Sequence, residues 1–130
     1  MPDNPLKIMV VDDEANISEL MQKVLVHRHG FITCGESDGG RAVELYKAQK
    51  PDISILDIQL DNSALDGIDV LREIRQINPQ AKCIMITRVT DAPAIEKAKA
   101  LGAAAYLLKP LDTREWIEVV LKVAVAVKGE

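Results

Sequence analysis

The sequence predicts an α/β fold: a five-stranded parallel sheet, with strand order 2-1-3-4-5, doubly wound with five helices. Three observations lead to this prediction. Five short apolar runs alternate along the chain with longer segments whose apolar residues recur at helical spacing. The short runs lack a polar alternation, which is typical of strands buried on both faces. Right-handed crossovers through helices would cover both faces, and 2-1-3-4-5 is a common order for five such strands.

The predicted strands are rich in aliphatic residues, and each is bounded by polar residues, glycine or proline. They cover residues 6–11, 31–34, 53–56, 83–86 and 104–108. Only 3% of the chain is aromatic, so the core is expected to consist of Val, Ile, Leu and Ala. Cys34 and Cys83 lie inside the second and fourth runs, and we interpret both as reduced core thiols.

Three helices are predicted before the fourth strand. The first has one apolar face and ends at Gly30, a residue type that commonly terminates helices. The next two cover residues 41–49 and 68–77, and in the latter Leu71 and Ile74 point inward. The apolar face of the first helix consists of Ile17, Leu20, Met21, Val24 and Leu25.

Two further helices are predicted at residues 93–101, before Gly102, and from Thr113 to about Val127, with Asp112 as the N-cap. The last helix is apolar around much of its circumference, which favours a contact with a partner or a homodimer contact. The alternative is that its final turn covers the lower edge of the core. The apolar residues are Trp116, Ile117, Val119, Val120, Leu121, Val123, Ala124, Val125, Ala126 and Val127.

Length and charge limit the organisation of the chain and its partners. With 130 residues and no repeat, low-complexity tract or linker, residues 1–130 are expected to form a single domain. The net charge of -4 argues against direct nucleic-acid binding and against a surface for anionic membranes. The chain starts without a leader pattern and has no apolar stretch of membrane-spanning length, so a cytoplasmic location is expected.

Polar side chains follow four of the predicted strands, which are neighbours in the predicted order. Because the carboxyl ends of parallel strands share one sheet edge, we expect these side chains to converge. Neighbouring carboxylates repel one another unless a cation lies among them, and Mg²⁺ prefers carboxylate oxygen and coordinates phosphate. The residues are Asp12 and Asp13 after the first strand, Asp57 and Thr87 at the ends of the third and fourth, and Lys109 and Pro110 after the fifth.

The charges of this predicted site suit phosphoryl transfer. The charges of three aspartates, Lys109 and Mg²⁺ cancel, so an incoming phosphoryl group would meet a neutral site. Asp57, central among the strands, is placed to be the nucleophile and to form an aspartyl phosphate. Asp12 and Asp13 are better placed to hold the metal, while Lys109 and Thr87 can contact the phosphoryl oxygens.

The segments VVDDE, SILDIQL, MIT and LLKP resemble, in order and spacing, the receiver domain of two-component response regulators, the CheY-like family with its flavodoxin-like fold. The resemblance covers the whole chain. It implies that Asp57 accepts a phosphoryl group from a phosphohistidine on a histidine kinase or phosphotransfer protein. It also implies that Asp12, Asp13, Asp57 and the backbone carbonyl of Gln59 bind magnesium.

The resemblance further implies a conformational switch. The hydroxyl of Thr87 would move toward the phosphoryl group, and the ring of Tyr106 would turn inward into the space released. The surface of the fourth helix, fifth strand and fifth helix would then change and control a downstream partner or output domain. The peptide bond between Lys109 and Pro110 would be cis. From the sequence alone, Tyr106 can equally be a fixed packing residue.

The chain departs from the family pattern in two places near the acceptor. The loop DIQLDNSALDG is about two residues longer than usual and lacks the usual proline, and Arg88 stands where a small residue normally follows the threonine. Arg88 could narrow access to Asp57, contact the phosphoryl group, or pair with Asp61 or Asp91. We expect it to slow transfer from small donors while admitting a particular partner protein.

Other functions fit these residues less well. Asp12 and Asp13 alone could begin a helix, where acidic residues complement the dipole, and Glu14 has no predicted role beyond that. A magnesium-dependent phosphohydrolase with an aspartyl-phosphate intermediate is the main alternative. Such enzymes typically need a second carboxylate, as acid/base, two residues beyond the nucleophile, and this chain has Gln59 at that position. A flavin-binding electron carrier would need hydroxyls and amides after the first strand to bind the flavin phosphate, and this chain has carboxylates there. An unphosphorylated interaction module is a further alternative. We expect a signalling receiver and not a turnover enzyme.

Overall fold

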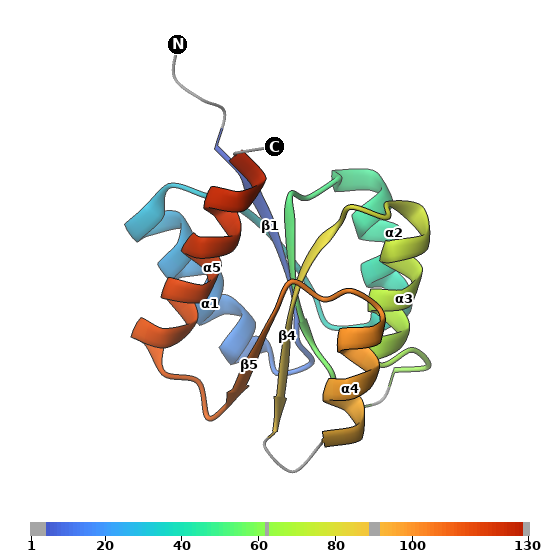
Figure 1. The fold of residues 1–130 in the computed structure, drawn as a ribbon. Helices are drawn as coiled ribbons and strands as arrows, with labels where there is room; N and C mark the ends of the chain where they lie inside the picture. The colour runs from blue at the N-terminus through green and yellow to red at the C-terminus, as the bar shows by residue number, and fades with distance from the viewer. Residues whose placement is uncertain (1–4, 62, 89–91, 129–130) are drawn as a thin grey trace.

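Five strands and five helices alternate along the chain in the computed structural model, which describes residues 5–61, 63–88 and 92–128 (Figure 1). All strands are parallel, in the order β2-β1-β3-β4-β5, and the predicted fold class is confirmed. The strands are β1 (Lys7–Val11), β2 (Ile32–Glu36), β3 (Ile53–Asp57), β4 (Lys82–Arg88) and β5 (Ala105–Lys109). The helices are α1 (Ala15–His29), α2 (Gly39–Gln49), α3 (Gly67–Ile77), α4 (Ala92–Ala100) and α5 (Thr113–Lys128).

The helices cover both faces of the sheet, α1 and α5 on one side and α2, α3 and α4 on the other (Figure 1). Every residue of β3 is buried, and alternate residues serve the two sides, which explains its lack of polar alternation. The α1/α5 core contains Ile8, Val10, Met21, Leu25, Ile53, Ile55, Ile84, Ile86, Leu107, Trp116, Val120, Val123 and Ala124. The α2–α4 core contains Met9, Val11, Ala42, Val43, Tyr46, Leu56, Ile58, Leu60, Ile68, Val70, Leu71, Ile74, Ala81, Cys83, Met85 and Ala98.

Several helix ends carry the capping residues that local chemistry favours. Gly30 follows α1 in the left-handed conformation, with φ 70°, which glycine adopts without a side-chain clash. Asp112 caps α5, because its Oδ1 accepts the backbone N–H of Glu115 at 3.1 Å. Asp66 and Asp69 form a reciprocal capping box at the start of α3, directly after the β3–α3 loop. Both signals predicted from the sequence, Gly30 and Asp112, are therefore confirmed.

Two predictions about burial need correction. Leu20 was expected in the core, but it is 60% exposed, because the buried stripe of α1 is narrow and consists of Ser18, Met21 and Leu25. Cys34 is only half-buried, since β2 is an edge strand of the sheet. Cys83 is buried in β4 as expected, and both cysteines are free thiols.

Helix α5 uses most of its apolar surface inside the protein. Ile117, Val119 and Val127 pack against the α1/α5 core beside the buried residues of the helix, whereas Val125 is 72% exposed. Packing therefore explains much of the apolar circumference, and a partner contact on α5 stays a prediction. Within the described part of the chain, no helix has the length and apolar character needed to cross a membrane.

Candidate functional site

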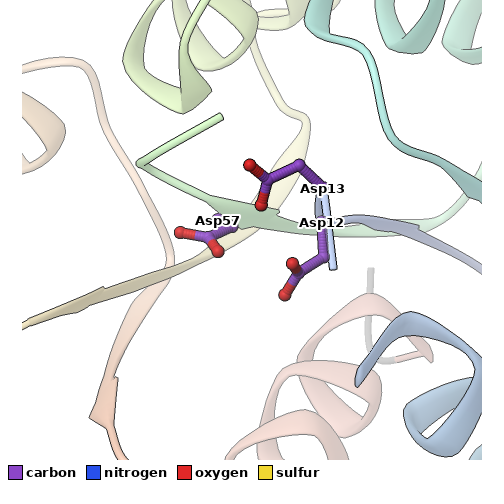
Figure 2. Close-up of side chains that lie close together, drawn as sticks. All are labelled: Asp12, Asp13 and Asp57. Carbon is purple, nitrogen blue, oxygen red and sulfur yellow. The ribbon is translucent and has the colours of Figure 1, made fainter. Parts of the chain in front are cut away.

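Three aspartates meet at the carboxyl edge of the sheet (Figure 2). Asp12 and Asp13 follow β1, and Asp57 ends β3, which pairs with β1 through Val11 and Leu56. One carboxylate oxygen from each aspartate lies within 4.8 Å of the other two. Asp12 and Asp57 are each 1% exposed, and Asp13 is half-buried. The strand order thus brings together the three carboxylates singled out in the sequence.

Lys109 supplies a positive charge to this cluster. It ends β5, and its ammonium donates a hydrogen bond to Asp57 Oδ2 at 2.7 Å. A carboxylate oxygen of Glu14 lies 3.9 Å from the same ammonium. Burial disfavours the charged lysine, but the hydrogen bond and charge of Asp57 outweigh burial and raise the pKa of Lys109. The peptide bond from Lys109 to Pro110 is cis.

Burial raises the pKa of two of the three aspartates. The pKa of Asp12 rises to about 6, since burial outweighs the hydrogen bond from the Glu14 amide, and the charge of Asp57 adds to the rise. Burial also raises the pKa of Asp57, against the opposing effects of Lys109 and the Gln59 amide. The cluster therefore resists full ionisation unless further positive charge is supplied.

The cluster fits a hard divalent cation. Asp12 Oδ1 accepts a backbone N–H at 2.8 Å, whereas its buried Oδ2 has no hydrogen-bond partner among the residues described. Asp13 Oδ2 accepts the backbone N–H of Asp61 at 2.9 Å. Both oxygens of Asp57 are bound, Oδ1 by the N–H of Gln59 at 3.0 Å and Oδ2 by the ammonium of Lys109. A buried carboxylate oxygen without a partner is destabilising, and coordination to a cation would satisfy it. All the available side-chain donors are carboxylate oxygens, which Mg²⁺ prefers.

The side chains expected to form a switch lie on β4 and β5. Thr87 is 1% exposed, and its hydroxyl makes one long hydrogen bond, 3.4 Å, to the carbonyl of Arg88 and none to Asp57. Tyr106 is half-buried against the α2–α4 core. Burial, together with the negative charge of Glu96, raises the pKa of its phenol.

Arg88 is exposed at the rim of the site, where β4 ends. Arg88 lines two hollows. The first, of about 630 Å³, is apolar and lies beside α1 and α5. The second, of about 610 Å³, is polar and lies beside α3 and α4. Asp61 lines the polar hollow too, but no ion pair joins it to Arg88; Asp91 lies outside the described residues. The apolar hollow is lined by Ile17, Leu20, Met21, Leu111, Trp116 and neighbouring residues.

Two contacts at the site were not predicted. Glu14 is the N-cap residue of α1 but makes no side-chain cap, and one of its carboxylate oxygens lies 3.9 Å from the Lys109 ammonium instead. The backbone N–H of Asp61 holds Asp13 Oδ2. Two features of the sequence bear on these contacts. Glutamate is a poor N-cap residue, which leaves the Glu14 side chain available for another contact, and the loop that contains Asp61 is longer than usual.

Comparison with known sequences agrees with this geometry. Residues 8–121 match the response regulator receiver domain. The chain is 34% identical over 119 residues to the chemotaxis protein CheY of Thermotoga maritima, which covers 91% of this chain and 97% of that protein. It is 33% identical over 117 residues to the chemotaxis protein CheY of Bacillus subtilis, covering 89% and 95% respectively.

Solved structures share the fold. The receiver domain of NtrX from Brucella abortus matches with a TM-score of 0.83 at 30% identity, covering 89% of this chain and 96% of that one. A CheY-like receiver domain protein from Methanospirillum hungatei matches with a TM-score of 0.87 at 21% identity, covering 97% and 98%. This chain belongs to the response regulator receiver domain family, the CheY-like signalling modules of two-component systems, which are not turnover enzymes.

Proposed function

We propose that this chain is a phosphoacceptor switch, in which Asp57 takes a phosphoryl group from a histidine kinase or a histidine phosphotransfer protein in a Mg²⁺-dependent reaction. One observation carries the proposal. The buried Asp57 carboxylate touches the ammonium of Lys109 at 2.7 Å and shares its site with two further carboxylates within 4.8 Å. A carboxylate that contacts a fixed cation and belongs to a cluster able to hold a second cation is suited to attack phosphorus.

The covalent step conserves charge and atoms. A carboxylate oxygen of Asp57 forms a bond to phosphorus, the bond from phosphorus to the donor imidazole nitrogen breaks, and that nitrogen keeps the electron pair. Lys109 neutralises part of the charge on the phosphoryl oxygens, and its raised pKa keeps it protonated for this role. The step yields an acyl phosphate on Asp57.

Asp12, Asp13 and Asp57 would hold Mg²⁺, and the backbone carbonyl of Gln59 would complete the protein's share of the coordination. The unpartnered Asp12 Oδ2 supports this assignment. When bound, the ion would neutralise anionic charge at the site and coordinate a phosphoryl oxygen. Gln59 offers no carboxylate for general acid/base catalysis, which favours a persistent signal over rapid hydrolysis.

Thr87 and Tyr106 would carry the signal from the acceptor to the surface of α4, β5 and α5. The hydroxyl of Thr87 has a weak attachment at 3.4 Å, which a phosphoryl oxygen could replace with a stronger bond. Tyr106 pairs with Met85 on β4, the strand that carries Thr87. A downstream effector or output domain would bind that surface, with self-association as a further outcome.

The donor protein would approach over the apolar hollow beside α1 and α5. The hollow is bordered by Lys109 and Arg88, so a protein seated there would lie next to the acceptor. The 60% exposure of Leu20 supports this role, since an exposed leucine beside an apolar hollow is suited to protein contact. Arg88 would restrict the access of small donors at the same rim.

We also propose that residues 1–130 form one receiver domain acting in the cytoplasm.

Incubation with Mg²⁺ and a small donor such as acetyl phosphate, followed by intact mass measurement, tests the central claim. One added phosphoryl group in the wild type, absent in Asp57→Asn, is expected. Continuous release of many equivalents of phosphate per protein would instead favour a phosphohydrolase. Absence of any adduct with small donors and with histidine kinases would favour an unphosphorylated interaction module.

A further inference from the structure

The loop between β3 and α3 is attached at one end to a carboxylate of the site. The backbone N–H of Asp61 donates to Asp13 Oδ2 at 2.9 Å. Asp13 is the least buried of the three aspartates, so fewer surrounding atoms restrict its orientation. The hydrogen bond from Asp61 is therefore an important restraint on the direction in which this carboxylate points.

The same loop is attached to the start of α2. Ser63 Oγ accepts the N–H of Gly39, the first residue of α2, at 2.9 Å and donates to the carbonyl of Leu65 at 2.6 Å. The hydroxyl thus uses its donor and an acceptor site together. A Cβ on Gly39 would overlap the carbonyl oxygen of Leu65, so the two segments approach as closely as only glycine permits.

A hydrogen bond links these two attachments. The backbone N–H of Ser63 donates to the carbonyl of Leu60 at 3.3 Å, and Leu60 is buried in the α2–α4 core directly before Asp61. A continuous path of backbone and hydrogen bonds therefore runs from Asp13 through Asp61 and Ser63 to Gly39.

The base of the loop is closed independently of this path. The backbone N–H of Gly67 donates to the carbonyl of Ile58 at 2.9 Å, and a Cβ on Gly67 would overlap the carbonyl oxygen of Asp57. The base of the loop is therefore fixed at Ile58 and Gly67. A displacement at Asp61 would then pass along the loop toward Ser63.

We propose that Ser63 is a positioning residue that couples the Asp13 carboxylate to the first turn of α2, so that a divalent cation bound at Asp13 changes the environment of Gly39. The part that concerns the cation rests on the proposed function. The coupling defines a second responsive surface at the start of α2, separate from α4, β5 and α5.

Amide exchange of the metal-free protein, measured by NMR, tests the coupling itself. Asp13→Ala removes the acceptor of the Asp61 N–H, and we expect the Gly39 amide to exchange about threefold to tenfold faster, as after loss of one ordinary hydrogen bond. Ser63→Ala, which removes the acceptor of Gly39 directly, should give at least the same increase. Ser37→Ala is the matched control, because its hydroxyl makes no hydrogen bond within the described segments. Unchanged exchange of Gly39 in Asp13→Ala overturns the proposal.

A Mg²⁺ titration of isotope-labelled protein tests the response to the cation. In the wild type the Gly39 amide signal should shift with the same midpoint as the amides of Asp12 and Asp13. In Ser63→Ala the shift at Gly39 should be lost while the site amides still respond. A wild-type Gly39 that stays in place while the site amides shift overturns the proposal. If no site amide responds, the proposed metal site fails, and the metal-free experiment alone decides the coupling.

Discussion

The ammonium of Lys109 donates a 2.7 Å hydrogen bond to the carboxylate of Asp57, although β4 lies between their strands. The two side chains are 18% and 2% exposed. Each charge therefore has little water around it and depends on the other for stabilisation. The contact also ties β5, an edge strand, to the centre of the sheet.

Replacing Lys109 by Met should leave the Asp57 carboxylate buried without its cation. We expect the free energy of unfolding to fall by about 1 to 3 kcal/mol at neutral pH. The double variant Asp57→Asn, Lys109→Met should recover most of this loss, because it contains no buried charge at that pair. Denaturant unfolding followed by the fluorescence of Trp116, the single and buried tryptophan, measures both. Equal losses in the single and double variants would contradict the pairing.

The metal-free protein should lose stability through Asp12 as the pH rises from about 4 to about 6. The pKa of Asp12 is raised from 3.8 to about 6 in the folded state, so the folded protein binds more protons than the unfolded chain in this range. Its stability must then fall with rising pH, by an amount on the order of 2 kcal/mol. The difference in unfolding free energy between wild type and Asp12→Asn, measured with a chelator present, isolates this contribution. A difference that does not vary with pH would exclude it.

Ser54→Ala should stabilise the protein. Ser54 lies in β3, is 1% exposed, and its hydroxyl has no hydrogen-bond partner in the segments that the structure describes. Removing a buried, unsatisfied hydroxyl is expected to raise the free energy of unfolding by about 1 kcal/mol. Ser18→Ala is the matched change, because the buried Ser18 hydroxyl accepts a hydrogen bond from Gln22 at 3.0 Å, and it should lower stability by about 1 kcal/mol. If both variants lost the same free energy of unfolding, the Ser54 hydroxyl would have a hydrogen-bond partner and the prediction would be wrong.

Leu20→Ser should slow phosphoryl transfer from a histidine kinase by about fivefold to tenfold, as expected for an apolar contact at the centre of an interface. Phosphorylation by acetyl phosphate and the stability of the protein should stay nearly unchanged, because Leu20 is 60% exposed. Val125→Ser removes another exposed apolar side chain, on α5 and outside the hollow, and serves as the control. Equal transfer rates for both variants would remove Leu20 from the donor surface.

Arg88→Ala should speed phosphorylation by acetyl phosphate about threefold to tenfold, which corresponds to a barrier lower by about 1 kcal/mol. The reason is steric, since the exposed arginine borders both hollows beside the acceptor. Arg72→Ala is a suitable control, because Arg72 lines the polar hollow but is paired with Asp69 at 3.2 Å. An unchanged rate would refute the access hypothesis, and a slower rate would indicate attraction of the anionic donor.

General rules of parallel sheets were sufficient to predict the acidic cluster. Asp12 and Asp57 are far apart in sequence, yet the predicted strand order and the shared carboxyl edge are enough to place them together, as the structure does. The strand boundaries were less predictable. β4 continues to Arg88 beyond the predicted residues 83–86, because backbone pairing with β5 does not require apolar side chains.

The contact between Asp61 and Asp13 and the exposure of Leu20 could not be predicted from residue types. The Asp61 N–H that holds Asp13 belongs to a group that every residue except proline carries, so no residue type signals it. Leu20 shares the helical spacing of Met21 and Leu25, but the width of a buried stripe is set by neighbouring elements and not by the helix itself.

Gly67 gives the β3–α3 loop an unusual freedom in length. Its N–H closes the loop on Ile58, and its missing side chain lets α3 start directly against the backbone of Asp57. Changes of length beyond Asp61 leave the Gln59 and Asp61 amides in place on Asp57 and Asp13, so they would reshape the outer contour of the loop without displacing the nucleophile. In such a loop, partner choice can diverge over evolution while the chemistry at Asp57 is inherited intact.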